Sequence, residues 1–149
     1  ELLATAIRIE DNAATFYRKA ADQHADGEVI AKLRELAAME EEHKQTFEAI
    51  RRDTPADAAD AVNPEGGLFM TAITGGARIE GAPRPADKLD GNETLADVLT
   101  LGIDLEKDTI LFYTGLKDMV SDQAAQSLER IINQEKAHIV ALHHALEQQ

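Results

Sequence analysis

Two segments of this 149-residue chain each carry a glutamate and a histidine three residues apart. Glu40 and His43 form the first Glu-x-x-His pair, and Glu135 and His138 form the second. Residues at positions i and i+3 lie on one face of an α-helix, so the two side chains of each pair converge on one point. Because carboxylates and imidazoles are both common metal ligands, this spacing indicates a metal-binding chemistry.

The second pair interrupts an apolar stripe of helical spacing. The stripe consists of Leu128, Ile131, Ile132, Ile139, Leu142 and Leu146, and Glu135 and His138 fill the gap in it. A charge at such a position is costly unless it is paired or bound to a metal. A single glutamate on an apolar stripe is commonly an interface residue whose carboxylate reaches water, so one pair alone is weak support for a site.

An internal repeat strengthens the argument. The segments "IEDNAATFY" at 9–17 and "LEKDTILFY" at 105–113 each place a lone glutamate on the stripe, followed by Phe-Tyr six and seven residues later. Glu10 precedes Glu40 by 30 residues, and Glu106 precedes Glu135 by 29. The chain therefore reads as two similar helical hairpins related by a pseudo-two-fold axis.

Four helices are needed to position these residues. The periodicity predicts helices over about 1–24, 27–52, 93–119 and 122–147. Asp26, Asn92 and either Ser121 or Asp122 are the expected N-caps of the last three. The crossover at about 53–92 holds all four prolines and six of the nine glycines, with a short helical or strand-like piece at "GGLFMTAI". We predict a single all-α domain over 1–149, a four-helix bundle whose two antiparallel helix pairs are joined by this long crossover.

Composition excludes several classes of function. The net charge is −13, from 15 basic and 28 acidic residues, and nucleic-acid binding requires the opposite balance. The chain has no cysteine, which excludes disulfides and cysteine-ligated iron. No apolar run approaches the length of about 18 residues that a membrane span needs. We expect a cytoplasmic protein without haem, flavin, nucleic-acid or membrane partners.

The charges of the four inward glutamates predict which ions would bind. Four carboxylates in one core repel one another unless some stay protonated or cations neutralise them. Two divalent ions supply the required four positive charges. An oxygen-rich ligand set with one imidazole per metal suits iron or manganese, whereas a structural zinc site favours sulfur and nitrogen ligands. On charge alone, Glu135→Ala is expected to lower metal occupancy while leaving the metal-free bundle folded.

These motifs resemble a known ligand pattern. The chain resembles the ferritin-like superfamily and, within it, the single-domain rubrerythrin-like di-iron carboxylate proteins that lack a rubredoxin domain. The resemblance covers nearly all of the chain outside the crossover and implies six metal ligands: Glu10, Glu40, His43, Glu106, Glu135 and His138. It implies that Glu40 and Glu135 bridge two irons, with Glu10 and His43 on one and Glu106 and His138 on the other. Tyr17 and Tyr113 either hydrogen bond ligand carboxylates or only pack in the core.

The resemblance also carries expectations about function. It implies a protein that binds two iron ions, with manganese or a mixed pair as the alternative, and oxidises Fe(II) with O2 or H2O2. Peroxide-reducing rubrerythrins typically carry another glutamate one turn after the third-helix ligand, and here that residue is Thr109. A peroxidase would need an external electron donor, and the family implies a homodimer or higher oligomer. An iron-storage or detoxification protein in a larger assembly and a non-catalytic helical interaction module are the alternatives.

Overall fold

The structure is a computed structural model that describes residues 2–55, 64–73 and 84–149. Within these ranges every regular element is helical, and no strand occurs. The elements are α1 (Leu2–Asp22), α2 (Glu28–Asp53), α3 (Pro64–Ile73), the 3-10 helix η2 (Pro85–Lys88), α4 (Leu95–Lys117) and α5 (Asp122–Glu147). The predicted all-α four-helix bundle is confirmed, with helix ends shifted by at most two residues.

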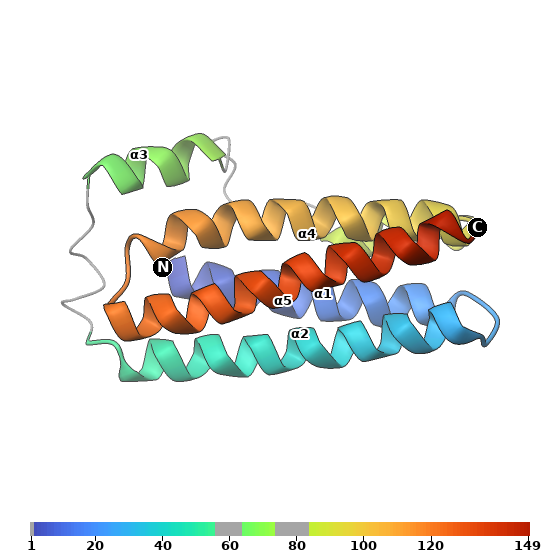
Figure 1. The fold of residues 1–149 in the computed structure, drawn as a ribbon, viewed down its shortest axis with the longest axis horizontal. Helices are drawn as coiled ribbons and strands as arrows, with labels where there is room; N and C mark the ends of the chain where they lie inside the picture. Colours follow the sequence, from blue (N-terminus) through green and yellow to red (C-terminus); the bar gives the residue numbers. More distant parts are fainter. Residues whose placement is uncertain (1, 56–63, 74–83) are drawn as a thin grey trace.

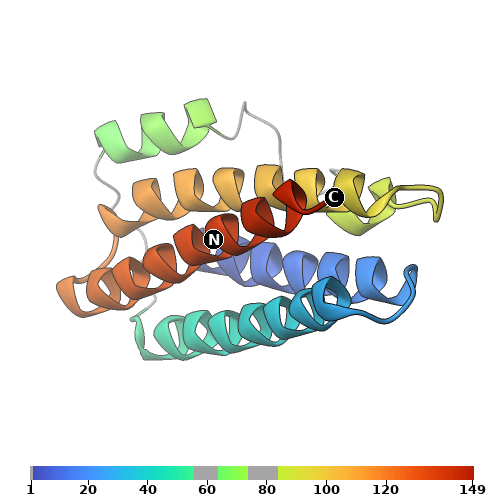
Figure 2. The same cartoon turned by 45° about the vertical axis from the view of Figure 1, so that its right-hand side comes forward.

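The four long helices form two antiparallel hairpins (Figure 1). The most extensive contacts join α1 to α2 and α4 to α5, which makes each hairpin a packed unit. Contacts of α1 with α4 and of α2 with α5 then join the hairpins (Figure 2). All four helices therefore face one common core, as the repeat predicts.

Two of the predicted helix caps are wrong. The cap of α2 is Gly27, which makes no side-chain cap, whereas Asp26 forms an ion pair with Arg34 at 3.2 Å. The cap of α4 is Thr94 rather than Asn92. Thr94 and Asp97 satisfy each other's backbone N–H groups in a capping box, which stabilises this start over one at Asn92. Ser121 caps α5 as expected.

Two apolar clusters divide the core, and each of the four long helices contributes to both. One cluster is built around Leu33, Leu36 and Leu99, and the other around Phe47 and Leu128. Along each helix, the buried polar residues lie between a stretch that joins one cluster and a stretch that joins the other. The arrangement seals the polar centre with packed apolar side chains at both ends, which keeps it dry.

The crossover is partly described, because 56–63 and 74–83 lie outside the described residues. The segment expected to be helical or strand-like is the helix α3, which lies along the outside of α4 (Figure 1). Gly115 of α4 allows this contact, since a Cβ there would lie 2.5 Å from the Sδ atom of Met70 and 2.8 Å from Phe69. Near η2, Lys19 of α1 donates hydrogen bonds to the carbonyls of Ala86 and Leu89, at 2.9 and 2.8 Å.

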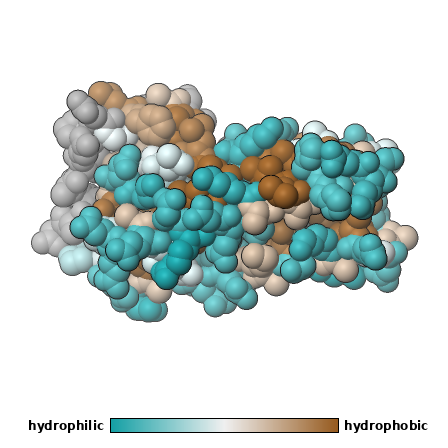
Figure 3. Space-filling model, in the orientation of Figure 1, coloured by the Kyte–Doolittle hydropathy of each residue, from teal (hydrophilic) through white to brown (hydrophobic). Residues whose placement is uncertain are grey.

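The surface is mostly hydrophilic, with apolar side chains gathered over α3 (Figure 3). Leu68 and Phe69 of α3 and Leu111 of α4 are exposed, as is Val140 of α5. None of the described helices combines the length and the apolar character that a membrane crossing requires.

Candidate metal centre

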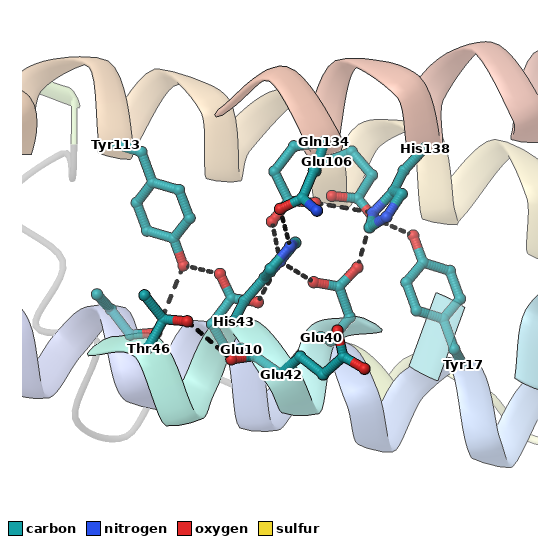
Figure 4. A network of polar contacts seen from close by, with 12 residues as sticks. Glu10, Tyr17, Glu40, Glu42, His43, Thr46, Glu106, Tyr113, Gln134 and His138 are labelled. Carbon is teal, nitrogen blue, oxygen red and sulfur yellow. Dashed lines mark hydrogen bonds and ion pairs between the residues drawn. The ribbon is translucent and has the colours of Figure 1, made fainter. Parts of the chain in front are cut away.

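Six ionisable side chains meet in the middle of the bundle (Figure 4). They come from all four long helices and are at most 4% exposed: Glu10, Glu40, His43, Glu106, Glu135 and His138. The helical repeat explains the convergence, because each helix turns its interrupted stripe toward the same core. The structure thus brings together all the residues that sequence analysis selected as metal ligands.

The six residues form two overlapping groups of four. Glu10 and His43 belong to one group, Glu106 and His138 belong to the other, and both groups contain Glu40 and Glu135. Within each group the potential ligand atoms lie within 4.8 Å of one another. The geometry is that of two metal positions with two shared carboxylates.

The shared carboxylates divide their oxygens between the two histidines. Glu135 places Oε1 3.0 Å from Nδ1 of His43 and Oε2 2.8 Å from Nδ1 of His138. Glu40 places Oε2 3.3 Å from Nδ1 of His43 and Oε1 3.0 Å from Nδ1 of His138. One oxygen of each carboxylate therefore faces each metal position, which is the arrangement a bridging carboxylate needs.

Several of these buried atoms make no hydrogen bond of good geometry among the described residues, although some lie close to an atom of opposite charge. They are Glu10 Oε2, Glu40 Oε1, both carboxylate oxygens of Glu135, and Nδ1 and Nε2 of His138. Buried polar groups without hydrogen bonds are costly and rare. All of these atoms except His138 Nε2 could serve as metal ligands. The set of donor atoms therefore fits metal ions bound between them.

Without a bound metal, burial and close contacts shift the pKa values of most ionisable groups in this cluster. Burial raises the pKa of Glu10 and of Glu106 well above the ordinary value, and neighbouring carboxylates raise it further. Burial would also raise the pKa of Glu40, but its contacts with the two histidines lower it to about 2. Burial opposes the charge on His138, yet the surrounding carboxylates raise its pKa to about 11, and that of His43 is raised as well. These raised pKa values favour protonation of two glutamates and both histidines in the metal-free protein.

Two tyrosines link the hairpins through the lone glutamates. The Tyr17 hydroxyl on α1 donates to Glu106 on α4, and the Tyr113 hydroxyl on α4 donates to Glu10 on α1 (Figure 4). Burial raises the pKa of both phenols, and the adjacent carboxylates raise it further, so both remain hydrogen-bond donors. The sequence allowed two roles for these tyrosines, hydrogen bonding to ligand carboxylates or core packing alone, and the structure shows the hydrogen bonds. They fix the orientation of the two unshared carboxylates.

One contact of the cluster was missed from the sequence. Gln134 on α5 lies directly before Glu135, and its Oε1 atom is 3.0 Å from Nε2 of His43. Its only sequence signal is its position beside a predicted ligand. Thr109, one turn after Glu106, is buried and offers no carboxylate.

Comparisons with known proteins agree with this geometry. A family model described as Rubrerythrin matches residues 1–67, which include α1 and α2. A solved structure from Thermotoga maritima, described as a ferritin-like diiron-carboxylate protein, is 29% identical with a TM-score of 0.79. That match covers 98% of this chain and 92% of the other. The comparison with curated proteins gave no match.

Together these two matches support a ferritin-like domain of the rubrerythrin type. The resemblance drawn from its sequence is thereby confirmed. The family model ends before α4, so the second half of the site depends on the full-length structural match and on the geometry. The buried glutamates and histidines of this chain could hold metal ions, and the structurally similar protein is described as a diiron-carboxylate protein.

Proposed function

We propose that this rubrerythrin-type domain binds two iron ions and oxidises Fe(II) with O2 or H2O2. One observation carries the proposal: two groups of four buried ligand residues share Glu40 and Glu135. Glu40 and Glu135, shared by both groups, would hold two ions next to each other. A pair of iron ions, when bound, supplies the two electrons that reduction of H2O2 requires.

The ligand set favours iron or manganese over zinc. Each metal position offers three carboxylates and one imidazole, and the chain has no cysteine. Oxygen-rich donors with an imidazole suit these metals, while structural zinc sites favour thiolates and imidazoles in fixed tetrahedral sets. Four carboxylates also match the charge of two divalent ions, so loading would neutralise Glu10 and Glu106, whose pKa values burial and then the neighbouring carboxylates raise.

The surrounding side chains of the domain support this chemistry. The two apolar clusters exclude bulk water from either end of the site. Tyr17 and Tyr113 hold Glu106 and Glu10 in place through hydrogen bonds. Thr109 contributes no carboxylate, so a redox-linked exchange of glutamate ligands at this position is not part of the proposal. The reducing equivalents for repeated turnover with H2O2 would come from an external donor.

The test is anaerobic reconstitution with Fe(II) followed by addition of O2 or H2O2. We expect the protein to bind two iron ions per chain. Fe(III) should form faster than in buffer alone, and its near-ultraviolet absorption measures the rate. Comparing the two oxidants separates ferroxidase from peroxidase behaviour. Iron uptake far above two ions per chain, in a large assembly by light scattering, would instead favour storage. Absence of iron uptake would refute the proposal.

A further inference from the structure

The outer nitrogens of the two histidines differ in their surroundings. Nε2 of His43 is 3.0 Å from the side-chain oxygen of Gln134. Nε2 of His138 is buried and has no hydrogen-bond partner among the residues that the structure describes. The two rings are otherwise similarly placed, with their centroids 5.8 Å apart and their planes 19° from parallel. The difference therefore lies in the neighbours and not in the rings.

The internal repeat identifies the residue responsible for this difference. Gln134 directly precedes Glu135, and the residue that directly precedes Glu40 in the other hairpin is Met39. A glutamine oxygen is a good acceptor for an imidazole N–H, whereas the thioether of methionine is a weak one. His43 thus has a strong acceptor in Gln134, whereas the repeat-equivalent position in the other hairpin holds a methionine and His138 Nε2 has no acceptor among the described residues.

This neighbour matters because of which nitrogen faces the metal. In both histidines Nδ1 points toward the shared carboxylates, which leaves Nε2 to carry the proton. A partner that accepts this N–H fixes the ring and its tautomer and makes the ligand nitrogen more basic. Loss of such a partner typically weakens metal binding by about 10–100-fold.

The ligand residues and the tyrosine hydrogen bonds are equivalent at the two metal positions. Glu40 and Glu135 belong to both, and each of the unshared glutamates accepts a hydrogen bond from one buried tyrosine. Each position also contains one glutamate and one histidine of its own. The hydrogen bond between His43 and Gln134 has no counterpart at His138 among the described residues.

We propose that Gln134 is a positioning residue that makes the two metal positions unequal, so that the first ion enters the Glu10–His43 position. The Glu106–His138 position fills second and exchanges its ion more readily. This inference rests on the two-metal site of the proposed function but concerns the order of loading, which oxidation activity does not report.

The experiment uses Co(II), which gives a diffraction signal of its own and does not turn over with O2 as Fe(II) does. Crystals of metal-free protein are equilibrated with one Co(II) per chain, and the anomalous signal measures occupancy at each position. The same test is applied to Gln134→Leu, to Met39→Gln and to the double variant. Gln134 is exposed and Met39 half-buried, so both single substitutions are compatible with the fold, and circular dichroism checks this.

In the wild-type protein we expect the Glu10–His43 position to hold about 90% or more of the cobalt, which corresponds to a ratio of at least about 10. Gln134→Leu should lower that ratio by about 10-fold or more through weaker binding at His43. Met39→Gln should lower it through stronger binding at His138. The double variant should reverse the preference, an effect that a merely structural role of either residue does not produce.

Two results would overturn the inference while leaving the proposed function intact. One is equal occupancy of the two positions in the wild-type protein. The other is a wild-type preference that persists unchanged in Gln134→Leu and in the double variant. If cobalt and iron bind at neither position, the inference and the proposed function both fail.

Discussion

Replacing Glu135 with glutamine tests the shared carboxylate on which the proposed site depends. The substitution keeps the shape of the side chain but removes one negative charge and an anionic ligand. Because Glu135 belongs to both groups of four ligand residues, each metal position keeps only three of them. We therefore expect Glu135→Gln to weaken both binding steps and not just one.

The expected magnitude follows from the number of ligands lost. Removal of a residue that only supports a ligand already costs about 10–100-fold in metal affinity. Loss of a direct ligand should exceed this, so each step should weaken by more than about 100-fold, or more than about 2.7 kcal/mol. The bound metal should accordingly be lost during dialysis against a weak chelator that leaves the wild-type protein loaded.

The structure also revises what the substitution does before metal binds. Charge alone suggested that loss of Glu135 relieves repulsion, but its oxygens lie 3.0 and 2.8 Å from the two imidazoles. Removing one partner of a buried ion pair costs about 3–5 kcal/mol. Because Glu40 still contacts both histidines, we take this as an upper limit. It corresponds to a melting temperature lowered by at most roughly 6–20 °C.

The assay combines anaerobic metal titration, metal content after dialysis and thermal unfolding of the metal-free protein. Glu42→Gln is the matched control, since it removes the same charge from an exposed side chain of α2. We expect this control to change metal affinity by less than about 3-fold, because exposed charges are screened by solvent. Retention of two metals with near wild-type affinity in folded Glu135→Gln would refute the bridging role.

Three further predictions concern the tyrosines, the bound protons and α3. Tyr17→Phe and Tyr113→Phe should each weaken metal binding by about 10–100-fold, measured by titration; an effect no larger than that of Glu42→Gln would leave the phenols with packing roles only. Metal uptake should release up to about four protons, because the pKa values of two glutamates and two histidines are raised. Metal affinity should therefore rise with pH. An indicator dye in weak buffer measures the proton release. For His138, whose folded pKa of about 11 exceeds the unfolded value of about 6.5, stabilisation of the metal-free fold is complete below about pH 6.5 and is lost as pH rises toward 11. Gly115→Ala should displace α3 from α4 and speed proteolysis there without changing metal content; unchanged proteolysis would show that the contact adapts.

The sequence determined most of the fold and the membership of the site. Apolar residues at helical spacing define four long helices, and the prolines and glycines between them mark the crossover. The two Glu-x-x-His pairs and the lone glutamates in matched contexts are visible because helical spacing converts directly into a shared face. Helix starts were less accurate, as at Thr94, because several nearby polar residues compete for the cap position.

Only the tertiary structure decided how the two hairpins share the site. The sequence did not indicate that Tyr17 reaches Glu106 while Tyr113 reaches Glu10, since these contacts cross from one hairpin to the other. Nor did it reveal that Gln134 contacts His43, because a residue beside a ligand on an exposed face looks like ordinary surface. Spacing along one helix fixes which side chains share a face, but contacts between helices depend on their packing, which no local pattern contains.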